Sequence, residues 1–247
     1  MMKFFNHIRR KLAAENKVMA YLRYAIGEIL LVVIGILIAL QVNNWNEHRK
    51  QNIQKNLIIK SLVTDLSMDT LMISKTLNTL RKDTTEVMGF VNRMSSSDVT
   101  LDTLIQIARF EFDPKIHVTV TFNDNTFRSL LSTGNINILD KWMQDEILQL
   151  NLMHDDNISR SDLNIQAYVN QVISYERMYP LSDYGNISPH SNLADAIWRK
   201  VKFEQLGTDL NALLAIRNIT DIYAIGQLKN IQEKTKQILK KINTQNN

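Results

Sequence analysis

The spacing of hydrophobic residues along the chain predicts that it is built from helices. Apolar residues form an unbroken run over residues 29–40. Farther along they recur in alternating steps of four and three, over residues 59–94 and again over residues 228–242. Such spacing places side chains on one face of an α-helix, and that face must be covered by other helices. We therefore expect one very apolar helix followed by long helices that pack as a bundle.

The repeat over residues 59–94, which we call the 59–94 seam, is the most regular of these patterns. Its members are Ile59, Val63, Leu66, Thr70, Ile73, Leu77, Leu80, Thr84, Val87, Val91 and Met94. Thr70 and Thr84 are polar and weaken it. A heptad repeat indicates that the seam is covered, and the covering helices can come from this chain or from another.

Turn and capping residues divide the middle of the chain into shorter elements. We expect a helix over residues 101–111 and then an extended segment over residues 116–122, where β-branched residues alternate but no partner strand is evident. Another helix is expected over residues 125–133, with Asn125 as its N-cap and Gly134 as a left-handed C-cap.

A further helix is expected to begin at Lys141, with Asp140 as its N-cap. The run Ser159-x-x-Asp162 resembles a capping box, which predicts a break near Ser159 rather than one continuous helix.

The carboxyl-terminal part is expected to hold two more helices after a loop over residues 181–190. The first covers residues 191–206, and the second begins after Gly207 with Thr208 or Asp209 as its N-cap.

The apolar run near the amino terminus is long enough to cross a bilayer. Extended to residues 24–42, it predicts a helix of roughly 28 Å at about 1.5 Å per residue. A buried core helix and a cleaved signal peptide are the alternatives. Basic residues lie on one side only, aromatic residues lie at both boundaries, and bulky residues occupy the place of a cleavage site. The residues expected at the membrane surfaces are Arg9, Arg10, Lys11, Arg23, Tyr24 and Trp45.

The distribution of charge indicates which side of the membrane each part occupies. Residues 1–24 hold six Lys and Arg and one Glu, a net charge of +5, whereas the whole chain carries +4. The remainder is therefore nearly neutral, which disfavours nucleic-acid binding. Because basic segments stay in the cytoplasm, residues 43–247 are expected outside it.

Two features lie within the predicted span. Gly35 and Ala39 form a small-xxx-small pair, with Gly27 on roughly the same face two turns earlier. Such a face lets membrane helices pack closely, although small residues are also common in membrane helices. Glu28 is costly inside a membrane, and we interpret it as reaching the headgroups or Arg23.

Two stretches of the chain are distinctive in sequence. One is YAIGEILLVVIGILIALQVNNWNE, residues 24–47, and the other is NTFRSLLSTGNINIL, residues 125–139, which includes Asn125, Phe127 and Gly134. Both resemble an uncharacterised family of bacterial single-pass membrane-anchored proteins, which more often has Tyr in place of Phe127. The resemblance implies an anchor in the inner membrane, a cytoplasmic amino terminus and a periplasmic helical domain of unknown function. It implies no catalytic residue.

Composition and motifs give little sign of enzyme chemistry. The chain has no Cys, so thiolate catalysis and Cys-ligated metals are excluded. No two of the five histidines share the spacing of a helical metal site, and no phosphate-binding loop occurs. The alternative hypothesis is an all-helical metal-dependent hydrolase that uses His154-Asp155, with His117 and Asp209 as further ligands. We expect no catalytic, cofactor-binding or metal-binding residue.

The predicted fold class is all-α, with an N-terminal transmembrane helix followed by an extracytoplasmic helical bundle of long, coiled-coil-like helices. The predicted parts are a basic cytoplasmic segment (1–23), the transmembrane helix (24–42) and the helical domain (43–247). The expected function is a membrane-anchored binding or scaffolding module. Its partners would be the lipid bilayer and a protein, or a second copy, held through the helical seams.

Overall fold

A computed structural model of the chain describes residues 18–117, 119–181, 188 and 190–245. Within these ranges the regular elements are helices and no strand is present, so the predicted all-helical fold is confirmed. The chain divides into two compact units, Met1–Ile58 and Ile59–Asn247. Helix α2 (Val18–Met94) contributes residues to both units.

The part of α2 in the first unit contains the predicted membrane span. Its most apolar stretch has a mean hydropathy of 2.6, and none of that stretch is buried in the protein. A helix from the core of a soluble protein would be covered, so the core-helix alternative does not fit this exposure. The length and composition of this helix are compatible with a single-pass membrane anchor.

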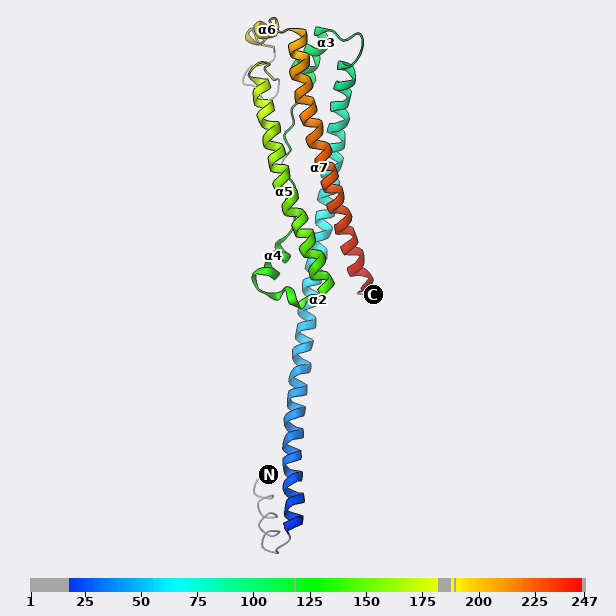
Figure 1. Cartoon of the computed structure of the whole chain (residues 1–247), viewed down its shortest axis with the longest axis vertical. Coiled ribbons are helices and arrows are strands. Elements are labelled where there is room, and N and C mark those ends of the chain that lie inside the picture. The colour runs from blue at the N-terminus through cyan, green and yellow to red at the C-terminus, as the bar shows by residue number, and fades with distance from the viewer. Residues whose placement is uncertain (1–17, 118, 182–187, 189, 246–247) are drawn as a thin grey trace. The chain divides into compact units, whose positions relative to one another are not determined.

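Three long helices form the second unit: residues 59–94 of α2, α5 (Lys141–Glu176) and α7 (Phe203–Gln245). α5 and α7 pack directly against each other (Figure 1). The short helices α3 (Leu101–Gln106) and α6 (Asn192–Trp198) lie at one end of this bundle, and α4 (Asn125–Ser132) lies at the other (Figure 1). A π-helix (Ile107–Glu111) continues α3, and a 3-10 helix (Asn135–Ile138) follows α4.

The 59–94 seam is covered within this chain and is wider than its heptad pattern predicts. All of its members are buried or partly buried. Gln232 of α7 reaches it and donates hydrogen bonds to the Thr70 carbonyl at 3.2 Å and to Ser74 Oγ at 2.7 Å. A second buried row runs beside it at multiples of seven residues: Leu62, Asp69, Asp83 and Phe90. Two aspartates therefore occupy core positions of α2.

The predicted break near Ser159 is wrong, because α5 continues as one helix through Glu176. Buried and partly buried residues keep a three-to-four spacing across that point, and several of them are polar, among them His154, Asn157 and Ser161. These polar residues interrupt the hydrophobic pattern without interrupting the packed face. Ser159 itself is exposed on the opposite face.

The predicted boundary between the last two helices is also wrong. α6 ends at Trp198 instead of residue 206, and α7 begins at Phe203 and runs through Gly207. Gly207 does not have the left-handed backbone that often follows a helix. Among the described glycines that conformation is found at Gly134, with a φ of 69°. Leu206 is fully buried in the first turn of α7, which explains why the helix begins before the glycine.

Several of the expected elements are confirmed. The helix over residues 101–111 is α3 with its π-helical continuation, and α4 ends before the left-handed Gly134. Asp124, rather than Asn125, is the N-cap residue of α4. α5 begins at Lys141 after Asp140, as predicted. Most of the loop expected over residues 181–190 lies outside the described residues.

Candidate functional site

The non-helical segment over residues 112–117 and 119–124, which we call the extended segment, lies among the helices of the second unit and receives polar side chains from all three long ones. Irregular backbone inside a bundle has no helical hydrogen bonds, so side chains must satisfy its carbonyl and N–H groups. α2 supplies Asp69 and Asp83, α5 supplies Tyr168, and α7 supplies Arg217. The hydrophobic pattern gave no sign that Asp69, Asp83 and Arg217 are buried.

Arg217 lies at the centre of a network of hydrogen bonds between α7 and the extended segment. Its side chain is only 4% exposed, and Nη1 donates to the carbonyls of Pro114, at 2.9 Å, and of Lys115. Nε donates to Asp221 Oδ2 at 2.9 Å. Tyr168 Oη donates to the same Pro114 carbonyl at 2.6 Å. A single guanidinium therefore ties two backbone carbonyls of the extended segment to α7.

Asp83 of α2 fastens the other side of this segment. It accepts from Lys115 Nζ at 3.2 Å and contacts His117 Nε2 at 2.5 Å. Burial raises the pKa of Asp83, but the hydrogen bonds from His117 and Lys115 outweigh burial and hold that pKa below its usual range. Arg217 Nη2 lies 3.1 Å from the same His117 nitrogen, so the imidazole sits between the carboxylate of Asp83 and the guanidinium of Arg217.

The cavity beside this network is small. It has a volume of about 60 Å³ and is lined by His117, Thr119, Ser161, Asn164 and Asp221 among others. A water molecule occupies roughly 30 Å³ in the liquid, so the space suits one or two waters. The network therefore has a structural role, which is to hold α2 to the extended segment and α7.

A second polar pair lies near α4. Asp69 Oδ1 accepts from the backbone N–H and from the side-chain amide of Asn123, both at 2.8 Å. His154 stacks on Phe122 with ring centroids 3.8 Å apart. Asp69 Oδ2 and His154 Nε2 are buried without a hydrogen-bond partner, and both residues line a cavity of about 20 Å³. That volume suits a single bridging water.

Burial changes the titration of this pair in opposite directions. It lowers the pKa of His154 to about 4 and raises the pKa of Asp69. Both shifts favour the uncharged forms.

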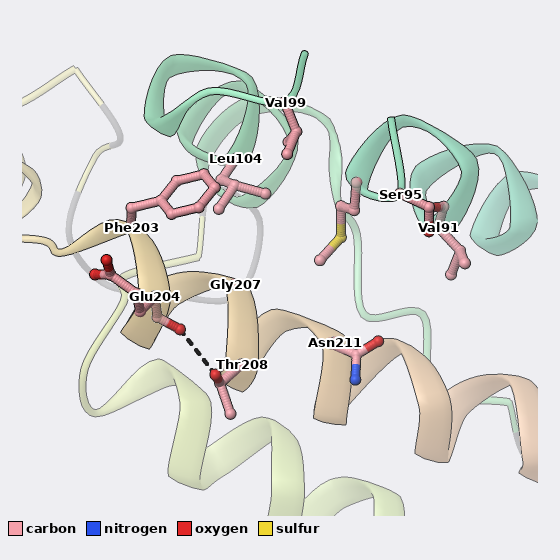
Figure 2. A pocket seen from close by; sticks show the side chains of 10 residues that line it. Val91, Ser95, Val99, Leu104, Phe203, Glu204, Gly207, Thr208 and Asn211 are labelled. Atoms are coloured by element: carbon pink, nitrogen blue, oxygen red, sulfur yellow. Dashed lines mark hydrogen bonds between the residues drawn. The ribbon is translucent and has the colours of Figure 1, made fainter. Parts of the chain in front are cut away.

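A larger opening lies where the end of α2, the helix α3 and the start of α7 meet (Figure 2). This groove has a volume of about 520 Å³. Its lining residues are Val91, Met94, Ser95, Val99, Leu104, Phe203, Glu204, Gly207, Thr208 and Asn211. Phe203 lies beside Leu104 on one side, and Val91 and Ser95 lie on the other (Figure 2).

The polar groups of the groove differ in their availability. Ser95 Oγ donates to the Val91 carbonyl and Thr208 Oγ1 donates to the Glu204 carbonyl, each at 2.8 Å. Both hydroxyl protons are therefore used in hydrogen bonds to the backbone one turn earlier. The side chains of Glu204 and Asn211 are exposed at the groove. The groove thus combines an apolar wall with one carboxylate and one amide.

The residues predicted at the membrane surfaces are described only in part. Arg9, Arg10 and Lys11 lie outside the described residues, as does the side chain of Tyr24. Arg23 and Trp45 are exposed, Trp45 at 64%.

The predicted transmembrane packing residues lie along the same helix. Among the described residues, no atom beyond the local helix backbone approaches the position of a Cβ at Gly27 or Gly35 within 4 Å, and Ala39 is exposed. Glu28 is partly buried and makes an interaction. The membrane role of these residues stays a prediction.

The second sequence motif forms α4 and its turn. Phe127 is only 5% exposed and packs beside the small cavity near His154, whereas Asn125 is exposed. Gly134 has the left-handed backbone that the Ser-x-Gly turn requires. The motif therefore has a structural explanation.

The residues of the metal-hydrolase alternative lie in separate surroundings. His117 contacts Asp83, Asp209 accepts from Tyr179 Oη at 2.8 Å, and Asp155 is exposed while His154 is buried. Among the residues that the structure describes, no group of three or more His, Asp or Glu side chains is arranged to hold a metal ion.

Comparison with known proteins finds one family whose model matches part of the chain. The chain is similar to a family of unknown function. The model of that family, described as Family of unknown function (DUF6090), matches residues 28–142. The DUF6090 match includes most of α2, the extended segment and α4, whereas nearly all of α5 and all of α7 lie beyond it. No curated protein and no solved structure matches the chain.

Proposed function

We propose that this protein is a membrane-anchored helical module that binds a partner protein in the groove between α2, α3 and α7. The groove carries the proposal. Its volume of about 520 Å³ falls in the range of ligand and side-chain binding sites. The other polar clusters of the bundle are occupied by the extended segment and leave little space.

The chemistry of the groove favours a particular kind of partner. Val91, Met94 and Phe203 give it a partly exposed apolar wall, with Phe203 at 38% exposure. Apolar and aromatic centres with a polar rim are typical of protein interfaces. Glu204 adds a negative charge at the edge, which suits a partner segment that carries an apolar anchor next to a basic residue.

We also propose a location for the module. The exposed apolar stretch of α2 supports a single-pass anchor. The basic segment over residues 1–23 supports a cytoplasmic amino terminus, which leaves the bundle in the periplasm. The resemblance of residues 24–47 to bacterial single-pass proteins supports the inner membrane. The proposal assigns no catalytic residue.

Site-specific photo-cross-linking tests the binding role. A photoreactive amino acid replaces Phe203 in the full chain, and Leu163, which is 65% exposed on α5, serves as the control position. After irradiation of intact cells, we expect a defined partner band from position 203 and none from position 163. Adding Glu204→Lys should weaken that band several-fold. Equal labelling at both positions, or none at position 203, contradicts the proposal.

A further inference from the structure

Helix α7 carries a second apolar face, on the side opposite its buried face. The residues of this face are Ala212, Ala215, Ile219, Ile222 and Gly226, which follow steps of three, four, three and four. All are exposed, Ile219 at 67% and Ile222 at 54%. We call this face the α7 stripe. It spans about four turns and has the spacing by which one helix packs against another.

The other long helices of the bundle have no comparable exposed face in the part of the chain that is described. On α5, the exposed Leu152 and Leu163 are separated by polar residues such as Ser159. On α2, the exposed Leu71 is followed one turn later by Lys75. Isolated exposed apolar residues are ordinary, whereas a continuous apolar face marks an interaction surface.

Apolar neighbours widen the α7 stripe on both sides. Met88 of α2 is 40% exposed, and its sulfur lies 4.0 Å from Asn218 Nδ2. Tyr223 is 36% exposed on the other flank, where its hydroxyl accepts from Arg160 of α5 at 3.2 Å. The stripe is therefore the middle of an apolar patch formed by residues of α7 and α2, with Arg160 of α5 at its edge.

We propose that the α7 stripe is the surface through which two copies of this chain associate. From Ala212 to Gly226 the side chains of the stripe are small, small, large, large and small in turn. Its two isoleucines lie at the centre and small residues lie at both ends, so the profile is nearly the same in either direction. A two-fold contact places the same patch on both subunits, and such a profile matches its own copy.

Charge and tethering also favour a second copy as the occupant. None of the five stripe residues is charged, and Arg217 and Asp221 of the same helix are buried, so the stripe is not repelled by an identical surface. Four turns are a small contact for association in solution. Copies held in one bilayer by the proposed membrane anchor, on which this inference rests, meet at a raised effective concentration.

The absence of cysteine in the chain permits a direct test. Ile219→Cys, Ile222→Cys and the control Leu163→Cys are made separately in the full chain, and membranes are treated with a short thiol-specific cross-linker. All three positions are more than half exposed, so the variants should fold alike. We expect a band at twice the chain mass from positions 219 and 222, at least five-fold stronger than from position 163.

A second variant tests whether the stripe drives the contact. Ile219→Asp, added to Ile222→Cys, should reduce the cross-linked dimer at least five-fold because it buries a charge between the copies. A dimer band that is absent, that is equal at all three positions or that survives Ile219→Asp overturns the inference. Cross-linking of Ile222→Cys to a protein of different mass overturns the second copy as occupant.

The same samples separate this inference from the proposed function. Chain recovered in the soluble fraction contradicts the membrane anchor, whereas chain in the membrane fraction without a stripe-specific dimer contradicts only the self-association. Photo-cross-linking at Phe203 reports on the groove independently of both results.

Discussion

Arg217 is the single residue on which the interior of the bundle most depends. It is 4% exposed and satisfies two carbonyls of the extended segment as well as the carboxylate of Asp221. Removing one partner of a buried ion pair leaves the other charge uncompensated, which costs much more than the pair itself contributes.

We expect Arg217→Met to lower the free energy of unfolding by about 3–5 kcal/mol, measured by urea denaturation of the detergent-solubilised chain. The matched control is Arg160→Met on α5, where the ion pair with Asp156 is about half exposed. Exposed pairs contribute about 0–1 kcal/mol, so the control should remain close to wild type. Losses of the same size in both variants would contradict a central role for Arg217.

His154 gives stability a defined dependence on pH. Burial lowers its pKa to about 4 in the native protein, against about 6.5 in the unfolded chain. Between these values the unfolded chain binds a proton that the native protein does not, so this group lowers stability as the pH falls. The raised pKa of Asp69 acts in the opposite direction, because the native carboxylate binds a proton more readily than the unfolded one.

We expect the His154 contribution to fall by about 2 kcal/mol between about pH 7 and about pH 5. His154→Phe keeps an aromatic ring for the stack on Phe122 and does not titrate. The measurement is the free energy of unfolding of both proteins at the two pH values. Parallel pH dependences of wild type and His154→Phe would refute the assignment to this histidine.

At the scale of elements, helix ends depend on backbone conformation more than on residue type alone. Gly134 has a φ of 69°, which side chains rarely adopt, whereas Gly207 lies within α7 and ends nothing. The two glycines look alike in sequence. Only Gly134 has the left-handed backbone that follows a helix.

This difference predicts opposite effects of the same substitution. Gly134→Ala should destabilise the protein by about 1 kcal/mol because of its backbone strain. Gly89→Ala, at an exposed position inside α2 with open space around it, should stabilise by about 0.5–1 kcal/mol. Thermal unfolding of both variants checks this pair. A stabilising Gly134→Ala would mean that the turn does not require a left-handed residue.

At the scale of the whole molecule, the apolar part of α2 should act as a membrane anchor. Leu37 is 59% exposed in the middle of the predicted span, and an arginine there costs about 2.5–3.5 kcal/mol in membrane insertion. We expect Leu37→Arg to shift a large fraction of the chain out of the membrane pellet after alkaline extraction. Ile53→Arg, at a 53% exposed position beyond the span, should stay in the pellet. Equal extraction of the two variants would contradict the anchor.

Local pattern was enough to predict the helical class, the long helices and the exposed apolar rod. Those features depend on residues three or four positions apart, and this spacing is visible directly in the sequence. The same reasoning failed in α5, where His154, Asn157 and Ser161 hold core positions although they are polar. A pattern of hydrophobicity cannot recognise a polar residue that occupies a buried position.

Only tertiary packing decided which groups the buried polar side chains contact. Arg217 meets the carbonyls of Pro114 and Lys115 about a hundred residues away, and Asp83 meets His117 across two elements. The groove and the α7 stripe likewise depend on which helix faces are covered. Helix formation is a short-range property of the chain, whereas burial is set by distant segments that share one core, and the functional surfaces are the faces that this core leaves uncovered.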